Sequence, residues 1–212
     1  MNTTAPFQLN PFTRFTAVYL TTLTSFAGIF HGIFEVLQGD KLIDTFFIQS
    51  IGPEHQRWLN GEEAFSILPS YLTTGITAIV ISLFIIWWGF KKLHTIYGPG
   101  ILAVAVVLLI LVGGGIVHML YFIPVLIFSG RIRNKISWRK NKPEDKSRRF
   151  LVKAWPSFLT LATLGFLASL ALAGFGIPGT SEIIITAGIA TSLLLALVFY
   201  LLSFLAAFAR DI

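Results

Sequence analysis

Long uncharged stretches dominate the pattern of hydrophobic and polar positions along this chain. Residues 101–130 contain no Asp, Glu, Lys or Arg, and four further apolar runs cover about 15–38, 70–90, 155–177 and 182–209. A bilayer core of about 30 Å needs about 20 consecutive apolar residues in a helix. Only helices and closed barrels satisfy their own backbone in hydrocarbon. The pattern therefore predicts an all-α polytopic membrane protein with five hydrophobic segments.

Composition agrees with this class. Hydrophobic residues make up 55% of the chain and charged residues 12%, against about 25% charged residues in soluble domains. No polar stretch is long enough to bury a core of its own, so a single transmembrane domain over residues 1–212 is expected. The chain has no Cys, which excludes disulfides and thiolate-bound zinc or iron–sulfur clusters.

The third hydrophobic segment, at about 101–129, carries its own interruption. Gly113, Gly114 and Gly115 adjoin near its middle, and Pro124 follows. A straight helix of this length would measure about 45 Å, which exceeds the bilayer core. Glycine clusters and prolines are the places where membrane helices bend or break. We therefore favour a segment that is broken at the glycines and turns back, with a single tilted crossing as the alternative.

Positive charge is concentrated in one place. Ten of the sixteen Lys and Arg residues fall in the segment 130–153, and short loops of this kind stay in the cytoplasm. We expect this basic loop and the C-terminus to be cytoplasmic in a cell membrane, with a prokaryotic one favoured. The broken segment would also place the N-terminus in the cytoplasm, whereas a single crossing would place it outside. The loop is expected to attract anionic lipid, and no nucleic-acid partner is expected.

Small and polar residues mark the faces on which helices should pack. In the first segment Gly28 and Gly32 have the four-residue spacing that lets helices approach closely, and Gly165 and Ser169 repeat it in the fourth. These faces suit a homo-oligomer or another membrane protein as partner. The loop at 40–70 is apolar enough around Leu42 to Ile51 to predict a short helix lying in the membrane interface.

Three ionisable residues within apolar segments are the candidates for chemistry. His31 and Glu35 are four residues apart and so share a helical face, and His118 follows the glycines. Both proposed topologies place all three toward one side of the membrane, which permits a cluster. Ionisable groups in membranes are costly and usually have a partner or a water-filled cavity. The simpler interpretation, favoured by the position of the pair in the last two turns of its helix, is that His31 and Glu35 bond each other and reach toward the interface.

Three functions are compatible with these features. The first is transport, or ion and proton handling, through a site near His31, Glu35 and His118. The second is an accessory or structural membrane subunit without chemistry of its own. The third, least favoured, is a haem- or metal-binding membrane protein that uses His31 and His118 as ligands. No nucleophile–base pair, nucleotide-binding fingerprint or metalloprotease motif occurs in the sequence, so we predict no catalytic residues and expect no cofactor.

Overall fold

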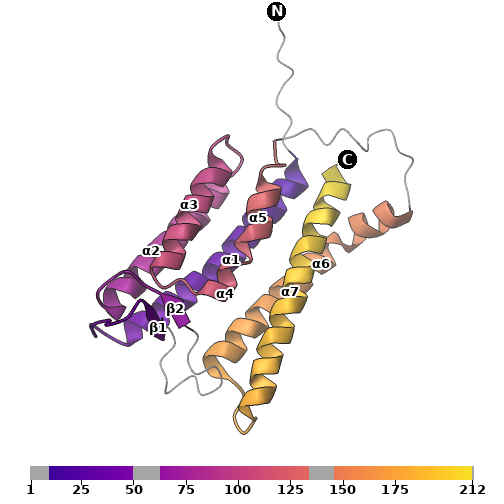
Figure 1. The fold of residues 1–212 in the computed structure, drawn as a ribbon. Coiled ribbons are helices and arrows are strands. Elements are labelled where there is room, and N and C mark those ends of the chain that lie inside the picture. Colours follow the sequence, from indigo (N-terminus) through magenta and orange to yellow (C-terminus); the bar gives the residue numbers. More distant parts are fainter. Residues whose placement is uncertain (1–9, 50–62, 134–145, 212) are drawn as a thin grey trace, which may run out of the picture.

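The computed structural model describes residues 10–49, 63–133 and 146–211 (Figure 1). Within them, the helices α1, α2, α6 and α7 are long and apolar enough to cross a membrane, and α3 is a shorter apolar helix. The protein is thus an all-α integral membrane protein with one small sheet. Its elements in chain order are α1 (Pro11–Leu37), β1 (Phe47–Gln49), β2 (Glu63–Phe65), α2 (Tyr71–Lys92), α3 (Gly98–Leu111), α4 (Ile116–Met119), α5 (Phe122–Ser129), α6 (Lys146–Phe175) and α7 (Glu182–Asp211).

Helix α1 lies at the centre of the bundle. It packs against α2 along its length and also contacts α5 and α7, whereas α6 and α7 form an antiparallel pair of their own. Figure 1 shows α2 and α3 on one side of α1, and α6 and α7 on the other. Because its neighbours surround it, α1 can bury polar side chains that lipid would not tolerate.

The polar side chains of α1 are numerous and mostly satisfied within the helix. Thr21 Oγ1 donates to the carbonyl of Ala17 at 2.7 Å, and Ser25 Oγ donates to the carbonyl of Thr21 at 2.8 Å. Such bonds to the preceding turn remove the cost of burying a hydroxyl group. The central helix therefore has a lower mean hydropathy, 1.4, than the other three long helices.

The start of α1 lies close to the ends of α5 and α7 at one end of the bundle. The side-chain amide of Asn10 donates to the carbonyl of Arg131 at 2.8 Å. The Asp211 carboxylate accepts the backbone N–H groups of Phe12 at 2.9 Å and Thr13 at 2.8 Å. A carboxylate is favourable at the start of a helix, where N–H groups lack partners and the dipole is positive. The last residue of α7 therefore caps the first turn of α1.

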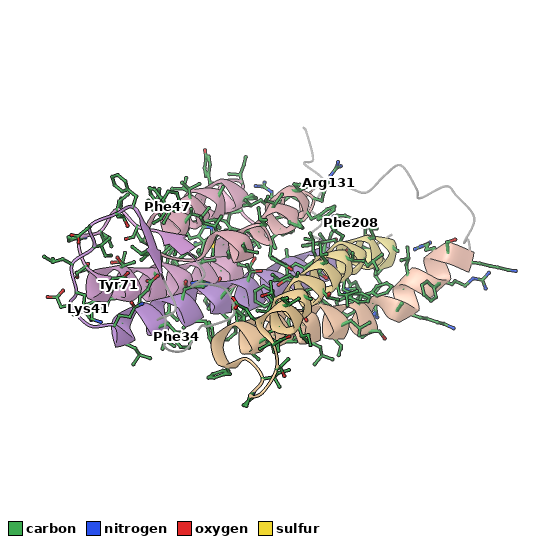
Figure 2. The ribbon with its side chains drawn as sticks, turned by 60° about the horizontal axis from the view of Figure 1, so that its bottom comes forward. Phe34, Lys41, Phe47, Tyr71, Arg131 and Phe208 are labelled. Carbon is green, nitrogen blue, oxygen red and sulfur yellow. The ribbon has the colours of Figure 1, made fainter. Side chains whose placement is uncertain are left out.

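The turn between α2 and α3 lies at this same end. The pKa of His94 is lowered by burial and by the positive charges of Arg14, Lys92 and Arg133, in that order. These cations come from α1, α2 and the residues after α5, so all three elements approach one another there. Figure 2 places Arg131 toward this end of the bundle and Lys41 at the opposite one. The basic ends of the helices are thus gathered together.

Helix α6 begins earlier than its sequence predicts. We expected it to start near Trp155, at the beginning of the run 155–177, whereas it starts at Lys146 and contains Pro156 in its interior. Proline removes one backbone hydrogen bond and costs about 3 kcal/mol inside a helix. Tertiary contacts offset this cost; for example, Arg148 Nε donates to the carbonyl of Ala209 on α7 at 3.1 Å. Part of the basic loop is therefore helical, and residues 134–145 lie outside the described part.

The expected interfacial helix at 40–70 is wrong for the residues that the structure describes there. Instead, β1 and β2 pair in antiparallel fashion, with Ile48 opposite Ala64. Both of these side chains are buried, whereas Phe47 is exposed. From Ala64 to Ile67 buried positions alternate with more exposed ones, which is the period of a strand rather than of a helix. Ile51 belongs to residues 50–62, which lie outside the described residues.

Candidate functional site

Two glycines bring α1 and α2 into backbone contact. A Cβ atom added at Gly32 would lie 2.7 Å from the carbonyl oxygen of Gly75, and one added at Gly75 would in turn meet the carbonyl of Gly32. Gly28 faces α2 as well, since its added Cβ would strike Ser82 Oγ. Close approach of this kind gives membrane helices the dispersion contacts that replace a hydrophobic driving force. The stripe predicted from the sequence is thus a contact face.

The chain leaves helical geometry between α3 and α4. Helix α3 ends at Leu111 and α4 begins at Ile116. Between them Gly113 has a φ of 90° and Gly115 a φ of 78°. These are left-handed conformations, which only glycine adopts at little cost. Pro124, the other predicted break residue, is instead buried inside the short helix α5.

The last residue of β2 and the residues after it satisfy backbone groups that this interruption releases. The N–H of Gly113 donates to the carbonyl of Phe65 at 2.8 Å, and the N–H of Ile67 donates to the carbonyl of Leu111 at 3.0 Å. Unpaired backbone groups away from water would cost several kcal/mol each. The small sheet therefore lies where it covers the interruption, which is a physical reason for strand rather than helix in this loop.

His31 and Glu35 lie directly against the interruption. A Cβ atom at Gly113 would come closer than 3.0 Å to both carboxylate oxygens of Glu35, and one at Gly115 would do the same to the imidazole ring of His31. Both side chains are fully buried. Glycine is therefore required here for two reasons, its left-handed backbone and the space that the two side chains occupy. A buried carboxylate beside a buried imidazole can bind and release protons or take part in holding a cation.

Two hydroxyl groups lie near Gly113, on which Glu35 packs. The methyl group of Thr74 also lies against Gly113, and its hydroxyl is hydrogen-bonded to Ser66 Oγ at 2.8 Å. Ser66 in turn lines a pocket of about 280 Å³ together with Asp44. Asp44 is exposed and precedes β1, which Figure 1 shows at the end of the bundle opposite the start of α1 and the end of α7. The hydrogen-bonded pair Thr74–Ser66 therefore lies between Gly113 and a surface pocket that contains Asp44.

The remaining predicted residues are placed as follows. His118 lies on α4, which packs against α1, but its side chain is outside the described part of the structure. Gly165 contacts α7, where its added Cβ would lie 3.1 Å from the carbonyl oxygen of Ser192. Ser169 is buried and donates to the carbonyl of Phe166 at 2.6 Å. The structure therefore brings His31 and Glu35 to one loop, and the membership of His118 stays a prediction.

The sequence did not indicate a pair of tyrosines that pack against each other beside α1. Tyr200 on α7 is fully buried, with its hydroxyl 3.1 Å from Thr24 Oγ1. The ring of Tyr121 meets that of Tyr200 at a centroid distance of 5.0 Å in an edge-to-face contact, and its hydroxyl donates to the carbonyl of Leu193. Thr24 lies on the same face of α1 as His31, and this was the only sequence feature that could have indicated a polar partner there. The spacing of Tyr121 and Tyr200 in the sequence does not predict that the two rings meet.

Within the described residues, no group of three or more His, Cys, Asp and Glu side chains could hold a metal ion. Comparison with known proteins adds no assignment: no family model, no curated protein and no solved structure matches this chain.

Proposed function

We propose that this protein moves protons or small cations across the membrane, or senses them, through the site formed by His31, Glu35 and the loop Gly113–Gly115. The observation that carries the proposal is the complete burial of an imidazole and a carboxylate against the glycine loop between α3 and α4. A purely structural contact would be served better by apolar side chains, which carry no desolvation penalty.

Discontinuous helices support this assignment. In membrane transporters, ion and substrate sites form where helices unwind and expose backbone groups close to the middle of the bilayer. Here the loop faces two ionisable side chains, and the hydrogen-bonded pair Thr74–Ser66 lies between Gly113 and the pocket at Asp44. We assign that pocket as the entrance, because a carboxylate attracts cations and hydroxyl groups can replace their water.

Flux through reconstituted vesicles tests this function. The purified protein in proteoliposomes that contain a pH-sensitive dye should dissipate a proton gradient, alone or in exchange for Na⁺ or K⁺. Glu35→Gln keeps the shape of the side chain and removes its charge, so it should reduce the flux by about tenfold or more. Asp40→Gln, an exposed residue beyond the end of α1, serves as the control. Flux equal to that of protein-free vesicles would favour the accessory-subunit alternative.

We further propose that segment 101–130 enters and leaves the membrane from the same side. The arms are α3 and α4–α5, and the basic ends of all the long helices then face the cytoplasm together with both termini. The chain has no native Cys, so single cysteines report on sidedness without background. An impermeant maleimide should label Lys41→Cys in intact cells and should label Ile96→Cys only after permeabilisation. The reverse pattern would establish a single crossing instead.

A further inference from the structure

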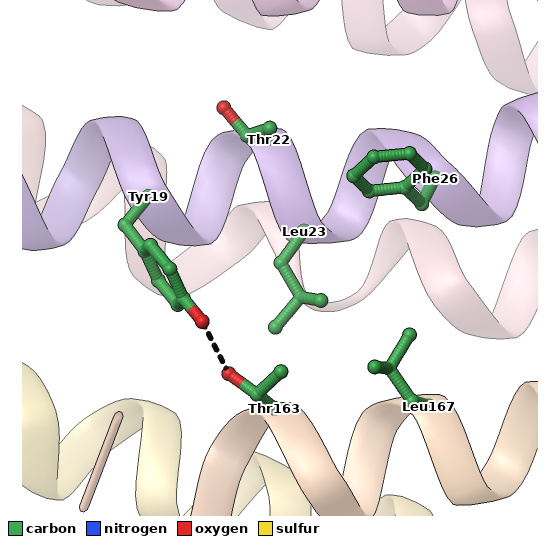
Figure 3. A pocket seen from close by; sticks show the side chains of 6 residues that line it. All are labelled: Tyr19, Thr22, Leu23, Phe26, Thr163 and Leu167. Carbon is green, nitrogen blue, oxygen red and sulfur yellow. Dashed lines mark hydrogen bonds between the residues drawn. The ribbon is translucent and has the colours of Figure 1, made fainter. Parts of the chain in front are cut away.

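A groove of about 330 Å³ lies between α1 and α6, and neither His31 nor Glu35 lines it (Figure 3). It opens toward the surrounding hydrocarbon because the outer flanks of both helices are exposed; Phe26 and Leu167, for example, are about half exposed. Its lining comes from four residues of α1 and two of α6: Tyr19, Thr22, Leu23, Phe26, Thr163 and Leu167.

The groove exists because α1 and α6 touch at separated points. The hydroxyl of Tyr19 lies 2.7 Å from Thr163 Oγ1 (Figure 3). Further along, the ring of Phe30 fills the space beside Gly174, where an added Cβ would collide with it. Between these two contacts the side chains of α1 and α6 leave a furrow. A furrow inside the bilayer is filled by hydrocarbon, since water has no partners there.

The hydroxyl groups of the lining are already engaged in the protein. Thr22 Oγ1 donates to the carbonyl of Val18 at 2.9 Å, and Thr163 Oγ1 donates to the carbonyl of Leu159 at 2.8 Å. The polar groups of the groove are therefore matched without an occupant. This lining suits an aliphatic chain and offers no specific site for a polar ligand.

The depth of the groove matches one leaflet of a bilayer. Thr163 follows Lys153 by ten residues, which is about 15 Å along a helix. That is half of a hydrocarbon core of about 30 Å. Trp155 lies near the level of Lys153 and packs edge-to-face on Phe12 and Phe15, as expected of an aromatic residue at the headgroups. A lipid whose headgroup is level with Lys153 would thus place its chain in the groove.

Positive charge lies at the headgroup level on the same part of α6. Arg149 and Lys153 are both exposed. Arg149 precedes Thr163 by fourteen residues, close to four complete turns, so it occupies the helical face that borders the groove. Exposed basic residues at a membrane surface attract anionic lipid. We propose that the groove binds one acyl chain of an anionic phospholipid whose phosphate group is held by Arg149 and Lys153.

Native mass spectrometry of the detergent-solubilised protein tests this site. Titration with phosphatidylglycerol should give a bound lipid with about tenfold higher affinity than phosphatidylcholine that has the same acyl chains. Leu167→Trp fills the groove and should weaken the binding of both lipids. Leu164→Trp is the matched control, because Leu164 is exposed on the same helix but does not line the groove. Exchanging Arg149 and Lys153 for Gln should remove only the preference for phosphatidylglycerol.

Three results would overturn the proposal. Equal affinity of the wild-type protein for the two lipids would show that Arg149 and Lys153 do not select the headgroup. Equal effects of the two tryptophan variants would show that the acyl chain does not lie in the groove. A dimeric mass in place of the lipid adduct would show that a second copy of the chain covers this face. The exchange of two exposed residues for Gln should leave folding intact, so this variant decides the headgroup question even if Leu167→Trp fails to fold.

Discussion

Gly115→Ala should lower the stability of the protein in detergent by about 2–5 kcal/mol. The left-handed backbone costs a residue with a Cβ about 1–2 kcal/mol, and overpacking against the buried imidazole of His31 adds about 1–3 kcal/mol. Thermal unfolding of the purified variant measures this effect. The expected result is a large fall in the midpoint temperature.

Gly39→Ala separates the two causes. Gly39 has the same φ of 78° as Gly115, but an added Cβ would meet nothing within 4 Å. It should therefore show the backbone cost alone. Adding His31→Ala to Gly115→Ala should recover part of the loss, because it removes the ring that collides. If Gly39→Ala and Gly115→Ala destabilise the protein equally, His31 does not lie against the loop.

Gly32→Ala should also destabilise strongly, by about 1–3 kcal/mol, because the new Cβ meets the carbonyl oxygen of Gly75. A backbone oxygen cannot rotate away, so α1 and α2 would have to separate. The matched control is Gly100→Ala in α3, where an added Cβ would meet nothing within 4 Å. That change should be neutral or stabilise the protein by up to about 1 kcal/mol through helix propensity. Thermal unfolding that is the same for both variants would show that α1 and α2 are not in backbone contact.

The sequence predicts the membrane class of the protein and the positions of its long helices well. A long uncharged run that lies in a bilayer has few alternatives to a helix. The described helices confirm the all-α class. The start of α6 was less predictable. A proline usually marks a helix beginning, but contacts between distant residues such as Arg148 and Ala209 carry the helix past Pro156. Tertiary packing overrides local propensity there.

The loop at 40–70 was mispredicted for a similar reason. Its apolar residues suit an interfacial helix when the loop is considered alone. Its actual partner is the backbone released between α3 and α4, which lies far away in sequence and needs extended chain at Phe65 to Ile67. A single sequence contains no signal for that pairing. The capping of α1 by Asp211 is hidden in the same way, since it joins opposite ends of the chain.

The candidate site was partly predictable from the sequence. Helical spacing puts His31 and Glu35 on one face, and consecutive glycines mark where the backbone leaves helical geometry. That these two features meet follows only from tertiary packing, in which α4 packs against α1 and α3 packs against α2. The hydrogen-bonded pair Thr74–Ser66 could not be predicted, because it depends on how the loop covers the interruption.

Proton handling by this site requires Glu35 to change its protonation state inside the folded protein, and infrared difference spectroscopy measures that change. Spectra of the membrane-reconstituted protein recorded across a pH step should contain a band from a protonated carboxyl group shielded from water. This band should be missing from Glu35→Gln, provided that the variant keeps its thermal stability. Identical difference spectra for the two proteins would show that Glu35 does not titrate, and would contradict the proposed role of the site in handling protons.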